Sequence, residues 1–223
     1  MAKRAVIIVA GGTGTRMNLN VAKQFLPLAD KPILLHTFDA FRLFDPSMQF
    51  VLVLYKSLHG EWQKIQREYG FELQHTAVEG GAERFHSVRN GLAAIENDVE
   101  VVAVHDAVRP LVSRDTIERA FNEAEKSGAA IPAIPVIDTI RRLENGDSYT
   151  LPRKELVAIQ TPQCFQVEVL RDAYQREYKD LFTDDASVVE DMGHQVKIVE
   201  GNRRNIKITT REDLLVANSF LKG

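Results

Sequence analysis

An apolar, β-branched run followed at once by a glycine-rich loop is the feature that most constrains the fold of this chain. Residues 5–9 read Ala-Val-Ile-Ile-Val, and residues 10–16 read Ala-Gly-Gly-Thr-Gly-Thr-Arg. A continuous apolar run of this length predicts a strand buried on both faces, as in parallel sheets. Glycines let the backbone turn sharply, and successive N–H groups can then form a concavity that binds anions. Together with the cations Arg16 and Lys23, the loop predicts a nucleotide phosphate site.

Two common phosphate-binding motifs do not fit this loop. The dinucleotide fingerprint G-x-G-x-x-G lacks its third glycine, because Gly12-Thr13-Gly14 is followed by Thr15-Arg16-Met17. The P-loop pattern G-x-x-x-x-G-K-[ST] occurs nowhere in the chain. A bare turn and a solvated Lys23 are the structural alternatives, and the position of Lys23 shortly after Arg16 weighs against them.

Apolar runs alternate with amphipathic segments along the whole chain. We therefore expect a single α/β domain over residues 1–223, with a mostly parallel sheet covered by helices on both faces. In such sheets ligands bind beyond the carboxyl ends of the strands. The expected strands are 5–9, 50–55, 73–78, 101–105, 130–134 and 196–199, and the expected helices are 32–43, 58–69, 84–95, 114–126, 167–179 and 211–221.

The segment 138–152 interrupts this alternation. Asn145-Gly146 is a strong hairpin signal between two strand-like runs. The hairpin has too few apolar residues to be stable alone in water, so we expect this β-arm to pack on something else, with a second subunit as a candidate.

Composition excludes several classes of partner. The 223 residues carry a formal net charge of −3, which offers no basic footprint for nucleic acid or an anionic membrane. No run approaches the length of a membrane span or of a signal peptide core. The single cysteine, Cys164, cannot form an intrachain disulfide, and we expect an inert, packed thiol in a cytoplasmic protein.

Polar residues follow other predicted strands. Asp106 and Arg109 come directly after 101–105, where they either line a site or form a structural pair that orders the loop; we expect His105 to be structural. Gly80-Gly81-Ala82 either reads a nucleobase edge through its backbone or is a plain turn. Lys207 lies between Ile206 and Ile208, which is also the pattern of an exposed edge strand.

Thr183-Asp184-Asp185 resembles the start of a helix. We expect Thr183 to be the N-cap with acids in the first turn, rather than a metal site, because adjacent helical positions do not share a face. No motif for hydrolytic, redox or zinc chemistry is present.

Taken together, strings distributed over essentially the whole chain resemble those of the 2-C-methyl-D-erythritol 4-phosphate cytidylyltransferase family. The resemblance implies transfer of the cytidylyl group of CTP to methylerythritol phosphate, in the non-mevalonate (MEP) isoprenoid pathway. It also implies a Rossmann-like nucleotide-diphospho-sugar transferase fold, Mg²⁺, and a homodimer linked by protruding β-arms. The strings are AGGTGTRM, AKQFLPL, GGAERFHSV, VHDAVRP, DTI, AIQTPQCF, TDDASVVE and VEGNRRNIKIT.

The resemblance also implies roles for individual residues. The catalytic set is Arg16, Lys23 and Lys207. The nucleotide-binding set is Ala10, Gly11, Gly12, Thr13, Gly14, Gly81, Ala82, Ser87 and Ala107. The set that binds the acceptor is Asp106, Arg109, Thr139, Arg153, Thr161 and Thr183, with Thr139 and Arg153 supplied by the partner's arm.

Three points stay open at this stage. Ribitol-5-phosphate cytidylyltransferases share several of these strings and Gly11, although Leu151-Pro152-Arg153 and TDDASVVE favour methylerythritol phosphate. A non-catalytic nucleotide-binding module is a second alternative, against which both lysines and Arg16 argue. The metal ligands are not identified: Mg²⁺ is expected to be held mainly by the phosphates of CTP, with Asp106 as a candidate ligand.

Overall fold

The structure is a computed structural model that describes residues 2–11 and 22–222. Gly12, Thr13, Gly14 and Arg16, which were expected to bind the nucleotide, lie outside the described residues. The main sheet has the order β10-β7-β11-β6-β1-β4-β5, and β12 pairs with β7. Its strands are β1 (Arg4–Val9), β4 (Gln49–Leu54), β5 (Thr76–Glu79), β6 (Val101–Asp106), β7 (Ala129–Pro135), β10 (Val157–Ile159), β11 (Gln163–Gln166) and β12 (Lys197–Glu200).

The centre of this sheet is parallel, as the sequence predicts. β1 pairs in parallel with both β4 and β6, and β5 extends the parallel set. β11 is antiparallel to β6 and β7, and β10 is antiparallel to β7. Neither β10 nor β11 was expected, because each is only three or four residues long and lacks the long apolar run that marks a buried strand.

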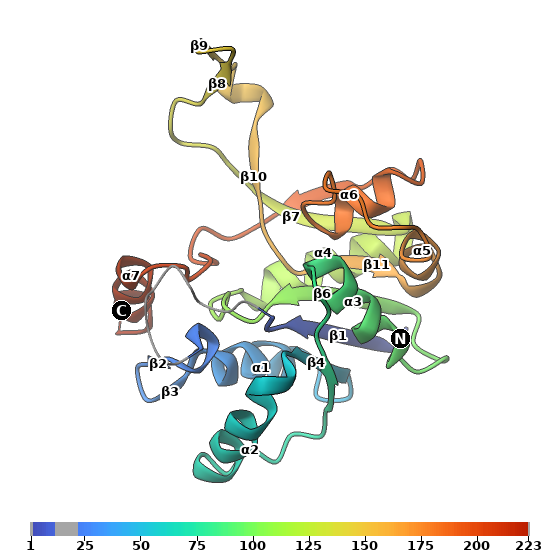
Figure 1. Ribbon diagram of the computed structural model, residues 1–223, viewed down its shortest axis with the longest axis vertical. Helices are drawn as coiled ribbons and strands as arrows, with labels where there is room; N and C mark the ends of the chain where they lie inside the picture. Colours follow the sequence, from blue (N-terminus) through green and yellow to red (C-terminus); the bar gives the residue numbers. More distant parts are fainter. Residues whose placement is uncertain (1, 12–21, 223) are drawn as a thin grey trace.

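Helices cover both faces of the sheet (Figure 1). They are α1 (Ile33–Phe44), α2 (His59–Glu68), α3 (Arg84–Ala93), α4 (Arg114–Ser127), α5 (Val167–Ala173), α6 (Asp185–Glu190) and α7 (Arg211–Lys222). Single 3-10 turns occur at η2 (Lys23–Phe25), η3 (Lys56–Leu58) and η4 (Arg153–Glu155), and β2 (Pro27–Leu28) pairs with β3 (Lys31–Pro32). α5 ends six residues before the expected end, because the side chains from Gln175 to Glu177 are exposed and supply no apolar face. Among the described residues, no helix is long and apolar enough to cross a membrane.

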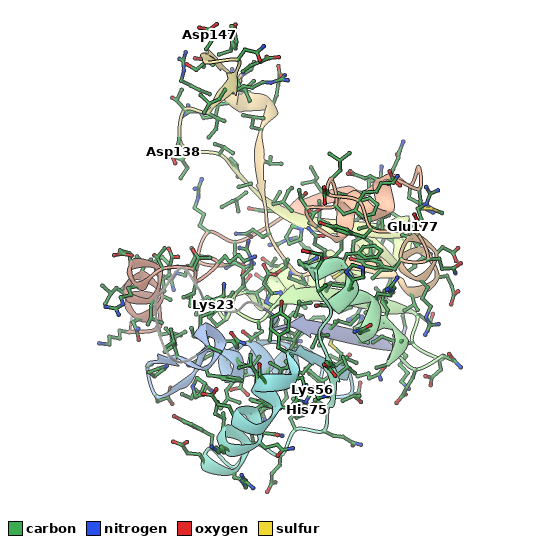
Figure 2. The ribbon with its side chains drawn as sticks, viewed as in Figure 1. Lys23, Lys56, His75, Asp138, Asp147 and Glu177 are labelled. Atoms are coloured by element: carbon green, nitrogen blue, oxygen red, sulfur yellow. The ribbon has the colours of Figure 1, made fainter. Side chains whose placement is uncertain are left out.

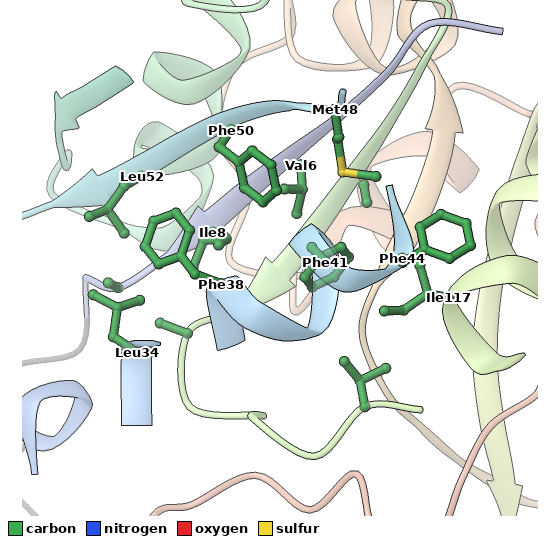
Figure 3. Packing of buried hydrophobic residues seen from close by; sticks show 14 of the residues in the cluster. Val6, Ile8, Leu34, Phe38, Phe41, Phe44, Met48, Phe50, Leu52 and Ile117 are labelled. Carbon is green, nitrogen blue, oxygen red and sulfur yellow. The ribbon is translucent and has the colours of Figure 1, made fainter. Parts of the chain in front are cut away.

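Alternation along β1 divides the core into two clusters. Val6 and Ile8 pack with aromatic residues of α1, among them Phe38 and Phe41 (Figure 3), whereas Ala5 and Ile7 face α3 on the other side. α3 approaches β1 closely: a Cβ on Gly91 would lie 2.7 Å from Cγ2 of Ile7. Burial on both faces explains why this strand is a continuous apolar run.

Helix boundaries follow local capping chemistry. Ser113 caps α4 by accepting a hydrogen bond from the Thr116 amide at 3.2 Å, and Gly128 ends the helix with φ of 91°, both as expected. Thr183 as the cap of α6 was wrong. Asp184 is the N-cap, because its carboxylate accepts from the Ser187 amide at 2.9 Å while the Ser187 hydroxyl accepts from the Asp184 amide.

The β-arm is present as predicted. β8 (Arg141–Glu144) and β9 (Asp147–Thr150) pair antiparallel around Asn145 and Gly146, whose φ values are 50° and 89°. Positive φ at both central residues is the signature of a type I′ turn. The arm projects from the body beyond β7 and β10 (Figure 1), and Leu143 at its tip is 82 % exposed.

Candidate active site

A pocket opens at the carboxyl ends of β1 and β6. The described residues that line it include many of the expected site residues: Ala10, Gly11, Lys23, Ser87, Asp106, Ala107 and Lys207. Val9 and Asp106 are register partners in the sheet, which places the residues after both strands at one edge. The expectation that ligands bind beyond these strand ends therefore agrees with the position of the pocket.

Hydrogen bonds fix the start of the glycine-rich loop. The Ala10 amide donates to the Val53 carbonyl at 2.9 Å, and the buried Gln24 amide donates to the Ala10 carbonyl at 2.8 Å. The Ala107 amide donates to the Val9 carbonyl at 3.1 Å. These bonds hold the first residues of the loop against the pocket wall.

Ser87 connects this wall to the loop that contains Gly80 and Gly81. Its hydroxyl, at the start of α3, accepts a hydrogen bond from the Gly81 amide at 3.0 Å. A Cβ on Gly81 would lie 2.3 Å from Cβ of His86, so the loop packs against α3 at a distance that only glycine permits. Ala82 beside it is exposed and presents its backbone rather than a functional side chain.

Asp106 is the electrostatic centre of the pocket. Its carboxylate lies 2.9 Å from Lys207 Nζ, 3.3 Å from Arg109 Nε and 3.9 Å from Arg84 Nε, and its side chain is only 11 % exposed. Burial alone would raise the pKa of this carboxyl, but Lys207, Arg84 and Arg109 outweigh it and hold the pKa well below its usual value. Asp106 is therefore ionised at neutral pH.

His105 and Thr161 form a buried hydrogen-bond network with the backbone of Asp106 and Arg109. The Thr161 hydroxyl accepts from the Asp106 amide and pairs with His105 Nδ1, both at 3.1 Å, while His105 Nε2 contacts the Arg109 carbonyl at 3.0 Å. Burial lowers the pKa of His105 to about 4, so the imidazole is neutral and fully engaged. His105 is structural, as expected, and Thr161 is buried beneath the pocket rather than exposed in it.

Arg109 forms the structural pair that the sequence offered as one alternative, and it is not among the residues that line the pocket. It pairs with Asp106, and its Nη1 donates to the Asn205 carbonyl at 2.8 Å, which ties the loop after β6 to the segment that carries Lys207. That segment is not the edge strand considered above, because residues 205–209 have no strand assignment. Ile208 is fully buried and its amide donates to the Val108 carbonyl, so Lys207 is directed toward Asp106.

Several expected acceptor-binding residues lie outside the pocket. Thr139, Arg153 and Thr183 are exposed, and Arg153 Nη1 donates to the Ile137 carbonyl at 2.6 Å at the base of the β-arm. Figure 2 shows Asp138 and Asp147 on the arm, apart from Lys23 in the body. The expectation that a partner's arm supplies Thr139 and Arg153 stays a prediction.

Arg84 is a lining residue that the sequence reasoning missed. It lies at the start of α3, pairs with the fully buried Asp185 of α6, and faces Asp106. Its place in the string Gly-Gly-Ala-Glu-Arg was the available signal, but nothing in the sequence links it to an acid 101 positions away.

Acids other than Asp106 do not gather at this pocket. Within residues 2–11 and 22–222, no group of three or more His, Cys, Asp or Glu side chains could hold a metal ion. Asp184 and Asp185 form a cap and a buried ion pair instead, as favoured over a metal site.

Comparison with known proteins gives one consistent family. The sequence model described as IspD, 2-C-methyl-D-erythritol 4-phosphate cytidylyltransferase, matches residues 4–223. A relative of that name from Phocaeicola vulgatus is 50 % identical over 218 residues, covering 98 % of this chain and 99 % of the relative. One from Bacillus licheniformis is 40 % identical, with coverage of 98 % and 95 %.

Solved structures agree with the sequence comparison. The 4-diphosphocytidyl-2C-methyl-D-erythritol synthase of Anaerococcus prevotii superposes with a TM-score of 0.85 at 28 % identity, covering 100 % of this chain and 99 % of the other. The 2-C-methyl-D-erythritol 4-phosphate cytidylyltransferase of Thermus thermophilus gives 0.80 at 31 % identity, with coverage of 99 % and 100 %. The α/β nucleotidyltransferase fold expected from the sequence is confirmed.

Proposed function

Because the chain belongs to the 2-C-methyl-D-erythritol 4-phosphate cytidylyltransferase family, we propose that the pocket around Asp106 is its active site. The chain is a CTP-dependent cytidylyltransferase of the MEP isoprenoid pathway. It joins CTP and 2-C-methyl-D-erythritol 4-phosphate into 4-diphosphocytidyl-2-C-methyl-D-erythritol and releases pyrophosphate. The observation that carries the site proposal is the convergence of Lys207, Arg109 and Arg84 on one ionised carboxylate, with Lys23 in the same pocket.

The reaction needs charge stabilisation more than proton transfer. An acceptor phosphate oxygen bonds to the α-phosphorus of CTP, and the bond from that phosphorus to pyrophosphate breaks. The acceptor is already anionic near neutral pH, so no general base is required, and the neutral, hydrogen-bonded His105 is not available as one. Positioning and electrostatics carry transfers of this kind.

Cations of this chain would supply that stabilisation. Lys23 and Lys207 border the pocket from opposite ends of the sequence, and Arg16 belongs to the same glycine-rich loop as Gly11. We assign Arg16 and Lys23 to the triphosphate and Lys207 to the phosphate that is transferred. Nucleotide contacts are assigned to the backbone of Ala10–Gly14, Gly81, Ala82 and Ala107, with Ser87 near the ribose.

Mg²⁺ fits this donor set when CTP is bound. Asp106 is the ionised carboxylate among the described lining residues, and Mg²⁺ prefers oxygen ligands that come largely from substrate phosphates. Bound there, the ion would neutralise phosphate charge. Asp106 would hold it while Lys207 and Arg109 turn toward the substrates.

A second copy of this chain would complete the part of the site that binds the acceptor. We place this dimer in the cytoplasm. Asp106 lines the pocket, Arg109 pairs with it, the Thr161 hydroxyl accepts from the Asp106 amide, and Thr183 is exposed after α5. Thr139 and Arg153 lie on the projecting arm, whose Leu143 and Tyr149 expose apolar surface. A homodimer that exchanges arms would bury that surface and bring the planar guanidinium of Arg153 to an acceptor phosphate.

Pyrophosphate release with CTP and Mg²⁺ tests the assignment, with methylerythritol phosphate, ribitol 5-phosphate or no acceptor added. We expect fast release with methylerythritol phosphate alone. Faster pyrophosphate release with ribitol 5-phosphate would mean that ribitol 5-phosphate, not methylerythritol phosphate, is the acceptor. Binding of CTP without pyrophosphate release would indicate a nucleotide-binding module.

A further inference from the structure

Arg84 lies between two carboxylates that belong to different parts of the site. Its Nη1 and Nη2 donate to Oδ1 and Oδ2 of Asp185 at 2.8 and 2.6 Å, which is a two-bond, fork-like pair. On its other edge, Nε lies 3.9 Å from Oδ1 of Asp106, too far for a hydrogen bond. Within the described part of the chain, this edge donates no hydrogen bond and faces the pocket.

Asp185 is built to hold the guanidinium still. Its side chain is fully buried, and the Tyr174 hydroxyl donates to its Oδ1 at 2.6 Å. Burial and the Tyr174 hydroxyl therefore fix the carboxylate, and its two hydrogen bonds with Arg84 hold the guanidinium in one orientation. A guanidinium has five N–H groups and Asp185 accepts from two of them, so Nε–H and the second N–H of each Nη atom are what Arg84 can offer to a ligand.

Arg84 gives the charged groups around Asp106 and Asp185 a positive excess. Asp106 and Asp185 contribute two negative charges. Without Arg84, the two positive charges of Lys207 and Arg109 would bring the net charge of the group to zero. Arg84 leaves this group of five with one positive charge in excess, beside Lys23. Substrates that meet as two anions need a standing positive potential, and fixed cations provide it without reorganisation.

We propose that Arg84 is a further substrate-binding cation of this active site, held by Asp185 and Tyr174 so that its Nε edge contacts the phosphate being transferred. This inference rests on the proposed function and deepens it. A structural alternative is that Arg84 only neutralises Asp185 and joins α3 to α6. The two alternatives differ in whether kcat recovers when Asp185→Asn is combined with Arg84→Gln, because an arginine that only neutralises Asp185 becomes dispensable once Asp185 has lost its charge.

Chemical rescue of Arg84→Ala tests whether catalysis needs the charge at this place. We expect kcat to fall by about 100-fold. Millimolar guanidinium chloride, well below denaturing concentrations, should restore part of it by entering the vacated place between Asp185 and Asp106. Urea, which has the same planar shape without the charge, should not. Equal recovery with urea, no recovery with guanidinium, or kcat within about threefold of the original enzyme would each overturn the proposal.

Two larger side chains keep the test decisive if Arg84→Ala does not fold. Arg84→Lys retains the charge and should lose about tenfold in kcat, whereas Arg84→Gln should lose about 100-fold. Equal kcat values for these variants would mean that charge is not needed. Arg89→Gln is the matched control, because Arg89 is an exposed arginine of the same helix outside the pocket, and its kcat should be unchanged.

The original enzyme is assayed beside every variant. Absence of cytidylyl transfer in the original enzyme would refute the proposed function itself. Transfer by the original enzyme, together with full activity of Arg84→Gln, would refute only the assignment of Arg84.

Discussion

Lys207 Nζ lies 2.9 Å from Asp106 Oδ2, although the two residues are 101 positions apart. The lysine side chain is 43 % exposed and the carboxylate 11 %, so Lys207 is the more accessible of these two lining residues. Under the proposed function, a substrate phosphate would compete with this carboxylate for the lysine. The ion pair would then keep Lys207 in place before substrates bind.

Replacing Lys207 tests this position. Lys207→Ala should lower kcat by about 100- to 1,000-fold, because an electrostatic donor to the transferred phosphate is removed. The fold should persist, since the lysine is partly exposed. Steady-state pyrophosphate release and thermal unfolding measure both quantities, with Lys197→Ala on the exposed strand β12 as the control. A near-original rate in Lys207→Ala would refute the role.

Asp106 should give the enzyme an acid-dependent stability. Folding lowers the pKa of this carboxyl, so its contribution is complete above the unfolded-state value of about 3.9 and is lost as pH falls toward the folded value. At pH 7, Asp106→Asn should destabilise the protein by about 1–3 kcal/mol, because three cations lose their partner.

The acid dependence itself is the critical measurement. Urea unfolding should show the difference in unfolding free energy between Asp106→Asn and the original protein staying constant above about pH 5 and narrowing as pH falls below about 4. Asp138→Asn replaces an exposed acid on the arm and serves as the control. It should change neither the unfolding free energy at pH 7 nor its dependence on pH. A gap that stayed constant or widened toward acid would contradict the lowered pKa.

Arg153 should act on the partner's site. Arg153→Ala should raise KM for the acceptor far more than KM for CTP, because the arm carries it away from its own pocket. In a heterodimer of Arg153→Ala and Lys207→Ala, one of the two sites would combine an intact core with an intact arm. Statistical mixing should then restore about a quarter of the original activity per protomer. Heterodimers without activity would place Arg153 and Lys207 in the same subunit's site.

Apolar surface on the arm should hold the dimer together. Leu143→Lys should shift the protein toward monomers and lower transfer activity by about tenfold or more, because it places a charge in the proposed interface. Sedimentation velocity and kcat are the measurements. Leu181→Lys is the matched control, since Leu181 is 81 % exposed and Leu143 82 %. Equal behaviour of the two variants would argue against the arm as the interface.

The sequence predicted local features well and distant pairings poorly. The strand at residues 5–9, the turn at Asn145-Gly146 and the cap at Ser113 each depend on a few neighbouring residues, and each was found. β11 was missed because its burial comes from β6 and β7 on either side, not from its own pattern. The ion pair of Arg84 with Asp185 was missed for the same reason.

Lys23 and Lys207 border the same pocket although one is translated long before the other. During synthesis, the chain can pair β1 with β4 and β6 well before residue 207 leaves the ribosome. Such a nascent domain would have the start of its glycine loop in place without Lys207. If Lys207 acts as proposed, the ability to transfer is acquired after all the strands of the main sheet have been synthesised.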